Sequence, residues 1–522
     1  MTNIHTLGEL RNSGYKVRSV KDEMRENLLQ KIARKDATFA GIHGYERTVI
    51  PALHNAILSK HDVILLGLRG QAKTRILRSL TSLLDERIPI VEGCEINDSP
   101  FQPACKRCRR LAAEKGDDLP IAWMHRDERY REKLATPDVT VADLVGDIDP
   151  IKAANQRLTY ADEEVIHYGI IPRTNRGIFA VNELPDLAPR IQVALLNILE
   201  ERDLQIRGFP VRIPMDVVLV FSANPEDYTS RGNIITPLKD RIDSQILTHY
   251  PQNVKTALQI TGQEAWTNRA GKAKIEIPDY VRELIEQIAF VARESELVDQ
   301  SSGVSARLTI SAMELLQSNL ERRAAMTGDE RVFPRLSDLA MVLPAITGKV
   351  EMVYEGEQQG AEVVARKLIG TAVGKLFESK FPPVERAGVT GRRGYEMDND
   401  ELEDAFAGRR VKKQPPQREE PKPNVKSEPN YDGILAWFVD GNKITLSDEQ
   451  PFADYMRELN RVPKLAETVK KYVQPRSEYE LGFWMEMVLE GMHQALRLSR
   501  EDLDSTITFQ ELMKFNVLRT VK

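Results

Sequence analysis

Eight residues in the first sixth of the chain have the types and spacing of a phosphate-binding loop: Gly67-Leu68-Arg69-Gly70-Gln71-Ala72-Lys73-Thr74. In the pattern G-x-x-x-x-G-K-[ST], small residues let backbone N–H groups wrap the phosphates, the lysine reaches the β and γ oxygens, and the hydroxyl holds Mg²⁺. A strand-forming run, Val63–Leu66, precedes the loop, and an amphipathic stretch, Arg75–Asp85, follows it. Anion binding needs this order of strand, loop and helix. The sequence therefore predicts a site for ATP and Mg²⁺.

The loop departs from its pattern at one position, because Ala72 stands where the second glycine belongs. Alanine has a Cβ and resists positive φ. The loop must therefore either take a backbone that alanine tolerates or hold nucleotide less well. The alternative interpretation of the segment is an ordinary glycine turn before a helix.

A second apolar strand, Ile178–Val181, ends in Asn182-Glu183. A P-loop ATPase has an acidic pair at such a place, the first acid for Mg²⁺ and the second to orient or deprotonate the attacking water. Asn182 keeps an oxygen for a metal-bound water but lacks the negative charge, whereas Glu183 remains as the predicted base. The alternative for Glu183 is an exposed carboxylate at the end of a strand. After a third strand, Val217–Phe221, Asn224 lies where a residue that senses the γ-phosphate would lie.

Two arginines extend the predicted site. Arg241, in the segment Leu238–Asp243, is placed to reach the nucleotide of a neighbouring subunit, as an arginine finger does. Arg307 opens a predicted helix and is placed to approach the γ-phosphate from the same subunit. Arg241 alone would be interpreted as a surface cation, and each arginine is a weak signal by itself, but their order along the chain supports the ATPase interpretation.

The composition bounds the class of protein. The chain of 522 residues has 73 basic and 78 acidic residues, a formal charge of -5, so its overall charge does not favour a polyanion partner. The start of the chain has no basic-then-apolar leader, and no apolar run approaches the roughly 18 residues that a membrane span requires. An odd count of 3 cysteines fits a reducing compartment. We therefore expect a cytoplasmic protein that binds no membrane.

Changes of pattern along the chain predict five segments. They are a helical lead-in at 1–45, an α/β core at 46–250 with an insertion at 92–150, an all-α lid at 251–383, a disordered linker at 384–430 and a small helical module at 431–522. Alternating strands and helices in the core favour a mostly parallel sheet, with strands at Val63–Leu66, Ile88–Val91, Ile178–Val181 and Val217–Phe221. Predicted helices are Ser19–Ile32, Arg190–Glu201, Tyr280–Ala292, Thr309–Arg323, Leu336–Ile346, Glu480–Leu498 and Phe509–Leu518. The linker should let the last module move independently.

All three cysteines fall in the insertion. Cys94, Cys105 and Cys108, followed by His125, form a set that suits tetrahedral Zn²⁺, although ten residues separate the first two cysteines. The alternative is three reduced thiols, with His125 on a helix surface. Neighbouring basic residues would lower the thiol pKa or form a partner surface, and a solvated charged face is the default interpretation. These residues are Lys106, Arg107, Arg109 and Arg110.

The order of these motifs resembles that of the AAA+ ATPases of the magnesium chelatase I-subunit and MoxR group, over about residues 20–380. Val165–Arg173 is similar to the extra helix 2 insert of that group. Glu201–Pro214 is placed like the group's hairpin before the sensor strand, and Arg173–Ile178 is one of the ordered motifs that carry the resemblance. By this resemblance, the site residues are Lys73 and Thr74 of Walker A, Asn182 and Glu183 of Walker B, Asn224 as sensor 1, Arg241 as the finger and Arg307 as sensor 2.

The resemblance implies a P-loop AAA+ core with a parallel sheet flanked by helices, followed by an all-α lid and a small helical C-terminal module. It also implies a homo-oligomeric ring, usually hexameric, and a partner that carries a von Willebrand A domain. No such domain is visible in the sequence, so we expect a separate partner protein. Ala72 and Asn182 depart from the group's pattern at nucleotide and metal contacts, which favours ATP binding with slowed hydrolysis.

Three functions compete at this point. The first is a ring motor that hydrolyses ATP to remodel a partner or client protein, in metal insertion or another task. The second is a nucleotide-gated scaffold with little or no hydrolysis, which Ala72 and Asn182 favour. The third is a nucleic-acid-dependent ATPase, suggested by the basic insertion and by the linker Arg409–Lys426. No aromatic residues interleave those charges, so nucleic acid is the least favoured partner.

Overall fold

A computed structural model describes residues 4–156, 162–206, 212–225, 233–271, 273–384, 431–503 and 506–512. The chain divides into two compact units. Unit 1 comprises Met1–Ala265, Ala292–Ile310 and Gly348–Gln358, and unit 2 comprises Trp266–Val291, Ser311–Thr347 and Gln359–Lys522. The boundary therefore runs through the predicted lid, 251–383, parts of which belong to each unit. The predicted linker, 384–430, lies outside the described residues except for Val384.

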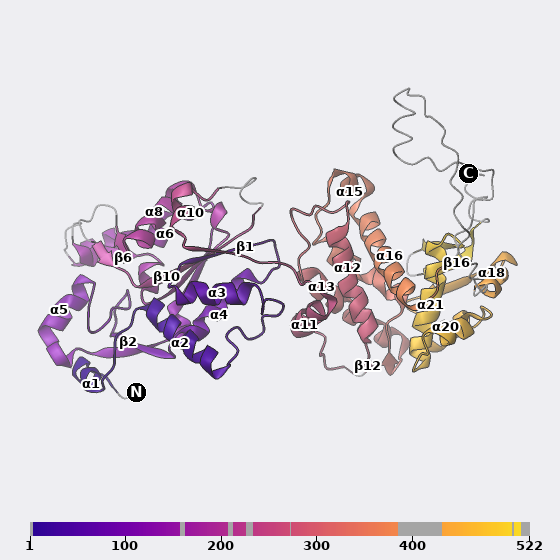
Figure 1. The fold of residues 1–522 in the computed structure, drawn as a ribbon, viewed down its shortest axis with the longest axis horizontal. Helices are drawn as coiled ribbons and strands as arrows, with labels where there is room; N and C mark the ends of the chain where they lie inside the picture. The colour runs from indigo at the N-terminus through magenta and orange to yellow at the C-terminus, as the bar shows by residue number, and fades with distance from the viewer. Residues whose placement is uncertain are drawn as a thin grey trace, which may run out of the picture. The chain divides into compact units, whose positions relative to one another are not determined.

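The core of unit 1 is a parallel five-stranded sheet with the strand order β11-β1-β10-β7-β4 (Figure 1). Its strands are β1 (Val63–Leu66), β4 (Tyr130–Leu134), β7 (Gly177–Asn182), β10 (Val217–Ala223) and β11 (Ser244–Leu247). The predicted strands in β1, β7 and β10 are confirmed. Because β4 and β11 lie at the two edges and carry several polar residues, the apolar pattern did not predict them.

The prediction that Ile88–Val91 belongs to the parallel sheet is wrong. This run is β2 (Arg87–Val91), and it pairs in antiparallel register with β3 (Ile121–His125) in a separate two-stranded sheet. The chain between β2 and β3 carries the cysteines and α5 (Lys106–Lys115). β2 and β3 therefore flank the part of the chain that carries the cysteines. β4, which also falls within 92–150, is the edge strand of the central sheet.

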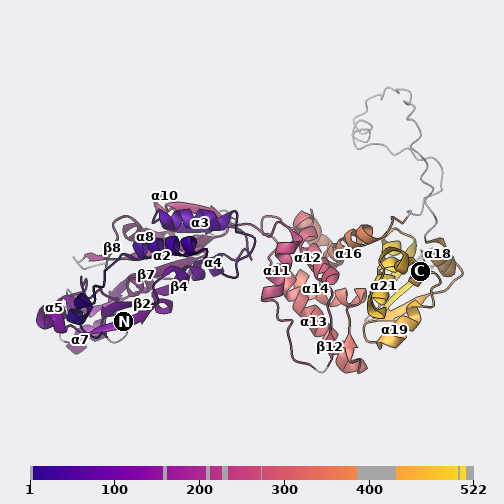
Figure 2. The same ribbon diagram turned by 60° about the horizontal axis from the view of Figure 1, so that its bottom comes forward.

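Side chains of the central strands alternate between two apolar layers, as the period of a strand requires. Val63 and Leu65 pack with α2 (Val20–Arg34), α3 (Val49–Leu58) and α4 (Lys73–Ser79). Ile64 and Leu66 pack in a second cluster with α8 (Pro189–Glu200) and α10 (Thr236–Arg241). Figures 1 and 2 show these helices around the strands. Burial on both faces explains why β1, β7 and β10 are almost continuously apolar.

Shorter elements complete unit 1. They are α1 (Leu7–Asn12), α6 (Val141–Leu144), β5 (Gly146–Ile148), α7 (Pro150–Gln156), β6 (Ile166–Tyr168), β8 (Asp203–Gln205), β9 (Arg212–Pro214) and α11 (Val254–Glu264). β8 and β9 pair in antiparallel register, which agrees with the predicted hairpin Glu201–Pro214. Among the described residues of either unit, no helix has the length and apolarity needed to cross a membrane.

Unit 2 combines most of the lid helices with the C-terminal residues. α15 (Tyr354–Gln359) belongs to unit 1 except for its last residue. The helices that lie wholly or mostly in unit 2 are α12 (Asp279–Glu294), α13 (Arg307–Thr327), a 3₁₀ helix (Leu336–Val342), α14 (Leu343–Thr347), α16 (Ala361–Lys380), α18 (Asp432–Val439), α19 (Phe452–Leu459), α20 (Leu465–Tyr472) and α21 (Glu478–Gln494). The first two and the last of these confirm predicted helices. Two short strands, β12 (Lys274–Ile275) and β13 (Arg331–Val332), pair beside them.

The C-terminal residues also form a three-stranded antiparallel sheet, which the prediction of a helical module omitted. Its order is β14-β16-β15, with β14 at Ile444–Ser447, β15 at Leu498–Leu503 and β16 at Thr506–Glu511. β16 overlaps the start of the predicted helix Phe509–Leu518, most of which lies outside the described residues. Ile507 and Phe509 are buried while their neighbours are not, so the true period at this place is two.

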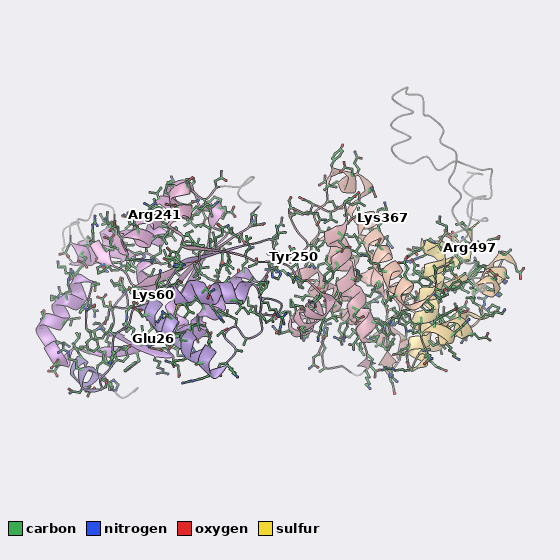
Figure 3. The ribbon with its side chains drawn as sticks, viewed as in Figure 1. Glu26, Lys60, Arg241, Tyr250, Lys367 and Arg497 are labelled. Atoms are coloured by element: carbon green, nitrogen blue, oxygen red, sulfur yellow. The ribbon has the colours of Figure 1, made fainter. Side chains whose placement is uncertain are left out.

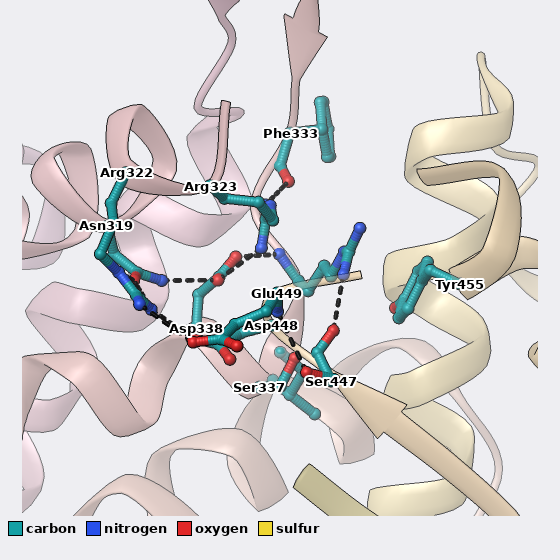
Figure 4. A network of polar contacts seen from close by, with 12 residues as sticks. Asn319, Arg322, Arg323, Phe333, Ser337, Asp338, Ser447, Asp448, Glu449 and Tyr455 are labelled. Atoms are coloured by element: carbon teal, nitrogen blue, oxygen red, sulfur yellow. Dashed lines mark hydrogen bonds and ion pairs between the residues drawn. The ribbon is translucent and has the colours of Figure 1, made fainter. Parts of the chain in front are cut away.

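A buried polar network joins the C-terminal residues to the lid helices within unit 2 (Figure 4). Arg323 and Asp338, only 2% and 0% exposed in their side chains, form an ion pair of 2.6 Å. Beside them, the Arg335 guanidinium donates hydrogen bonds of 2.7 Å to the carbonyls of Ser447 and Gln450. The expectation that 431–522 moves independently is thus wrong for its described residues, since a buried network of this kind holds them to the lid.

Candidate functional site

The predicted phosphate-binding loop joins the end of β1 to the start of α4, and close contacts require both of its glycines. A Cβ on Gly67 would lie 1.9 Å from Thr248 Oγ1, and a Cβ on Gly70 would lie 2.1 Å from Ser305 Oγ. Gly70 also has a φ of +72°, which other residues rarely adopt. The loop can therefore pack against β11's end and the segment before α13 only with glycine at these two positions.

Ala72 takes the left-handed conformation that the glycine of the pattern would take, with φ 57° and ψ 17°. The first of the two outcomes expected from the sequence, a backbone that suits alanine, is therefore not what the structure has, because Ala72 keeps the conformation of a glycine. A left-handed L-residue costs about 1–2 kcal/mol. Ala72 is also the N-cap of α4 and provides no side-chain hydrogen bond to it. The loop keeps its shape at a cost in stability.

Ala72→Gly should therefore stabilise the protein by up to about 1 kcal/mol, because relief of the left-handed strain exceeds the added backbone entropy of the unfolded chain. Chemical denaturation of both proteins measures the difference. Ala52→Gly is the matched control, since Ala52 is exposed inside α3, where the same change should destabilise by about 0.5–1 kcal/mol. Equal destabilisation by the two substitutions would contradict the strain at Ala72.

Lys73 and Thr74 form the first turn of α4, directly after the loop. Lys73 is only 8% exposed, and its Nζ donates hydrogen bonds to the carbonyl oxygens of Gly67 and, at 3.1 Å, Leu68. The ammonium group thus lies against the loop, where phosphate oxygens would meet it. Thr74 is half-buried beside it. Lys73 and Thr74 thus begin the helix that follows the loop, as the lysine and the hydroxyl of the pattern do.

A cavity of about 190 Å³ lies beside the loop in unit 1. Gly70, Ala72 and Arg307 line it, so the structure brings the predicted second arginine to the phosphate-binding loop. Its other lining residues are Gly41, Ile42, His43, Gly44, Tyr45, Gln71, Arg75, His249, Pro251, Ile260, Gln263, Glu264, Ala306 and Ile310. The lining thus combines apolar and polar side chains, as in sites that bind a small organic group.

Sequence reasoning missed the part that residues 41–45 play in this cavity, because it placed them at the end of the helical lead-in. The Tyr45 hydroxyl lies 2.9 Å from the Gln71 carbonyl oxygen and 2.8 Å from that of His249, and it donates its one proton to either of them. Burial raises the pKa of Tyr45 to about 12, so it stays a donor at neutral pH. The signal in the sequence for a turn at this place was the pair of glycines, Gly41 and Gly44. Both have positive φ in the structure.

The carboxyl end of β7 presents Asn182 and Glu183. Asn182 is 8% exposed, and its Oδ1 accepts a hydrogen bond of 3.2 Å from Ser222 Oγ on the adjacent strand β10. Glu183 N–H donates to the same hydroxyl at 3.4 Å, and Glu183 has a left-handed backbone with φ 56° and ψ 50°. Strained residues of this kind gather at functional sites. The geometry is consistent with Glu183 in a catalytic position.

Glu132 on β4 is a candidate residue that the sequence did not reveal. Its carboxylate accepts hydrogen bonds from Arg78 Nε at 2.9 Å and from the Tyr130 hydroxyl at 3.1 Å. Arg78, with smaller contributions from Tyr130 and the side chain of Asn182, lowers the pKa of Glu132. A carboxylate therefore stands beside the asparagine that replaces the metal-binding acid. The charge-rich strand Tyr130–Leu134 gave no pattern that distinguished Glu132.

Asn224 follows the end of β10 next to the phosphate-binding loop. Ala223 pairs with Leu66 in the sheet, and its carbonyl accepts a hydrogen bond of 3.2 Å from Gly67 N–H. Asn224 is 4% exposed, and its Oδ1 is buried without a hydrogen bond from any described residue. A buried amide oxygen of this kind is rare unless a ligand or water satisfies it. The position fits a residue that contacts nucleotide or attacking water.

Arg241 is not brought to the cavity of its own chain. It is the last residue of α10 and lies at the surface of unit 1 (Figure 3). Its guanidinium pairs with Glu200 on α8 at 2.6 Å and donates to the Pro237 carbonyl at 3.0 Å. Both alternatives for Arg241 therefore stay open: it is either a surface cation or a group that acts on the nucleotide of a neighbouring subunit.

Residues 121–242, from β3 to the end of α10, match the AAA domain of the dynein-related subfamily. This stretch contains Asn182, Glu183, Asn224 and Arg241, and the phosphate-binding loop precedes it in the same parallel sheet. The α/β core therefore has the AAA+ P-loop fold. Its fold is the predicted P-loop core with a parallel sheet flanked by helices.

Three solved structures are similar to the chain. NtrX from Brucella abortus shares 13% identity, with a TM-score of 0.30, over 60% of this chain and 55% of NtrX. Its complex with ATP gives 14% identity, a TM-score of 0.37 and coverage of 67% and 66%. A complex of the magnesium chelatase subunits BchI and BchD gives 19% identity, a TM-score of 0.33 and coverage of 62% and 98%. The chain thus spans little more than half of the first NtrX chain. No curated protein matches this sequence.

The insertion of the α/β core gathers its three cysteines, but not with His125. The ligand atoms of Cys94, Asp98, Cys105 and Cys108 all lie within 4.8 Å of one another. His125, at the end of β3, instead contacts Asp127 at 3.2 Å. The predicted fourth ligand is therefore corrected from His125 to Asp98. Hydrogen bonds from the other two thiols lower the pKa of Cys94 to about 4, and burial raises the pKa of Asp98 to about 7.

Three basic residues of α5 pair with an acidic segment of the same unit, 162–164. Lys106 pairs with Asp162 at 2.8 Å, Arg109 with Glu163 at 3.0 Å, and Arg110 with Glu164 at 2.6 Å. These side chains are exposed, so the run forms the solvated charged face that was the default expectation, with three of its four cations paired to acids. Paired charges of this kind offer less attraction to a polyanion than the sequence indicated.

Proposed function

We propose that this protein is an ATP-hydrolysing motor that assembles into a ring, hexameric as in the magnesium chelatase I-subunit and MoxR group that it resembles. In this proposal, it uses ATP with Mg²⁺ to change the conformation of a partner or client protein. The observation that carries the proposal is the convergence of Lys73, Glu183 and Asn224 at the carboxyl ends of the adjacent strands β1, β7 and β10. Parallel α/β sheets bind ligands at this edge.

The roles of the residues follow from their places. Lys73 and the loop would hold the phosphates, Thr74 and Asn182 would hold Mg²⁺ and its waters, and Glu183 would deprotonate the attacking water. The cavity of about 190 Å³ is smaller than the roughly 300 Å³ of a typical ligand pocket. It would therefore take the nucleoside part of ATP, with the phosphates along the loop.

The partners are proposed from the resemblance. A separate protein with a von Willebrand A domain would work with the ring, and the task would be metal insertion or a related remodelling step. The third function, a nucleic-acid-dependent ATPase, is disfavoured because Lys106, Arg109 and Arg110 of α5 are paired with acids. ATP turnover that is unchanged by added DNA or RNA would exclude it.

A nucleotide-gated scaffold is the second candidate, and two specific observations favour it. Ala72 strains the phosphate-binding loop, and Asn182 removes a negative charge from the metal site. Such a protein would bind ATP, assemble and turn over almost nothing. Mg²⁺-dependent hydrolysis across a series of protein concentrations separates the candidates: specific turnover that rises with concentration supports a ring motor, and tight ATP binding without turnover supports a scaffold.

Glu132 should partly replace the missing charge at Asn182. Glu132→Gln should then weaken the apparent Mg²⁺ affinity by about 10–100-fold, as the loss of an outer partner of a metal site does. Asn182→Asp should restore the charge and raise Mg²⁺ affinity and turnover. Titration of Mg²⁺ against ATP turnover, or against binding of a fluorescent nucleotide if turnover is absent, measures both effects.

The double variant is the control for this prediction. In the Asn182→Asp background, Glu132→Gln should cost much less Mg²⁺ affinity than in the wild type, because the carboxylate at position 182 supplies the charge directly. Residues that serve one site couple in this way, whereas independent residues have additive effects. Equal costs in both backgrounds would limit Glu132 to its ion pair with Arg78.

A further inference from the structure

The strongest group of reactive side chains outside the nucleotide site is the cluster Cys94, Asp98, Cys105 and Cys108, which we call the insertion cluster. Its ligand atoms all lie within 4.8 Å of one another. Ligands at about 2.3 Å from a tetrahedral zinc ion are about 3.8 Å apart. Small side-chain rotations would bring the four atoms to that separation. The backbone of the insertion therefore already has the dimensions of a four-ligand metal site.

The carboxylate of Asp98 gives independent evidence for a ligand. Asp98 is 1% exposed, and its Oδ2 accepts a hydrogen bond of 2.9 Å from Cys105 N–H. Its Oδ1 is buried and accepts no hydrogen bond from the described residues. A buried carboxylate oxygen without a partner is costly, and metal coordination is one of the ordinary ways in which proteins compensate for it. A cation among the three sulfur atoms would satisfy Oδ1.

Hydrogen bonds around the sulfur atoms favour thiolates, which are the form that binds metal. Asp98 N–H donates to Cys94 Sγ at 3.3 Å, and Cys108 N–H donates to Cys105 Sγ at 3.4 Å. The Arg107 guanidinium lies 4.0 Å from Cys108 Sγ and is fixed by the Gly93 carbonyl at 3.0 Å. Three thiolates and one carboxylate carry four negative charges, two more than a divalent cation neutralises. The positive charge of Arg107 offsets part of this excess.

We propose that the insertion cluster binds one zinc ion through Cys94, Asp98, Cys105 and Cys108. Thiolate ligands select zinc over the hard cations Mg²⁺ and Ca²⁺. Four protein ligands leave no open coordination position, so the ion is structural and takes no part in ATP hydrolysis. Cys105 is also the N-cap of α5, so the ion fixes the start of this helix. The site is independent of the proposed motor function.

The role of the ion follows from what α5 contacts. Lys106 N–H donates to Glu163 Oε1 at 2.7 Å, and the basic side chains of α5 pair with the acids at 162–164. The loop between β2 and α5, residues 92–105, has no strand or helix of its own to hold it. Zinc would therefore hold this loop and, through α5, the segment before β6.

Zinc content and cobalt spectroscopy of the full chain, purified under reducing conditions, test the proposal. The wild type should hold about one zinc per chain, and Co²⁺ exchanged into it should give sulfur-to-cobalt charge transfer and tetrahedral d–d absorption. Cys94→Ser should lose zinc and the charge-transfer band. Asp98→Asn should weaken zinc retention against a chelator by more than the roughly 10–100-fold that an outer partner contributes.

His125→Ala is the matched control, because His125 lies on the same insertion but outside the cluster, and it should retain zinc at the wild-type level. Circular dichroism identifies any variant that fails to fold, and the near-isosteric Asp98→Asn keeps the test valid if Cys94→Ser does not fold. A wild-type chain that holds no zinc, takes up no Co²⁺ and has three equally reactive thiols would overturn the proposal. So would a Cys–Cys disulfide in the chain purified without reductant, or loss of zinc from His125→Ala with retention by Asp98→Asn.

Discussion

Glu183→Gln should lower ATP turnover by about 10²–10⁴-fold, the contribution that a positioned general base makes. Glutamine has the shape of glutamate but cannot accept the proton of the attacking water. Glu183 follows the end of β7 with a left-handed backbone, next to the strand end that carries Asn224. Because the substitution leaves the loop and the cavity unchanged, nucleotide binding should persist, and the variant should accumulate ATP in place of ADP.

Single-turnover hydrolysis and nucleotide binding, measured on the same samples, test this expectation. Glu201→Gln is the control, because it makes the same chemical change at an exposed residue at the end of α8, away from the site. A wild type with measurable turnover and an unaffected Glu183→Gln variant would show that the base is another group. A wild type with almost no turnover to lose would support the nucleotide-gated scaffold.

The central sheet was predictable because its middle strands are buried on both faces. Val63–Leu66, Ile178–Val181 and Val217–Phe221 have no polar residue that could face solvent, and each lies within a strand of the structure. The residues that follow these strands share one edge, so chain order alone placed Lys73, Glu183 and Asn224 near each other. For these elements, local sequence and global fold agree.

Contacts between distant segments were not predictable from pattern. Asp98 joins the insertion cluster through the fold of the loop before α5, whereas His125, the last residue of β3, contacts Asp127. Residue type favoured His125, since histidine is a commoner zinc ligand than a lone acid in a polar loop. Glu132 likewise acquires its place from the pairing of β4 with β7, a pairing that no local signal at Tyr130–Leu134 indicates.

The C-terminal residues show a further limit of sequence reasoning. The proline- and charge-rich composition between the lid and residue 431 suggested separation in space as well as in sequence. Arg335, however, places its guanidinium over the Tyr455 ring at 4.3 Å, and Glu486 accepts hydrogen bonds from Leu336 N–H at 2.9 Å and Ser337 N–H at 3.0 Å. Buried charged groups with satisfied partners hold the two segments together, and such partners cannot be read from composition.

Arg241→Ala should lower turnover by about 10³–10⁵-fold if Arg241 acts as an arginine finger in a ring. Its guanidinium pairs with Glu200 on the surface of unit 1 and is absent from the lining of the chain's own cavity. An arginine placed in this way can stabilise transition-state charge only in the site of an adjacent subunit. Glu200→Gln is the control, because an exposed ion pair contributes no more than about 1 kcal/mol and its loss leaves the arginine in place.

Mixing of two inactive chains decides whether Arg241 acts between subunits. Lys73→Ala removes the loop's ammonium but leaves Arg241, whereas Arg241→Ala leaves a complete phosphate-binding loop. In a mixed ring, a Lys73→Ala chain would provide its Arg241 to the intact loop of an adjacent Arg241→Ala chain, and turnover should reappear at a fraction of the wild-type rate. The double variant Lys73→Ala/Arg241→Ala, mixed with either single variant, offers no such complete site and should stay inactive. Mixtures that stay as inactive as their components, in chains shown to assemble together, would assign Arg241 to its ion pair with Glu200 alone.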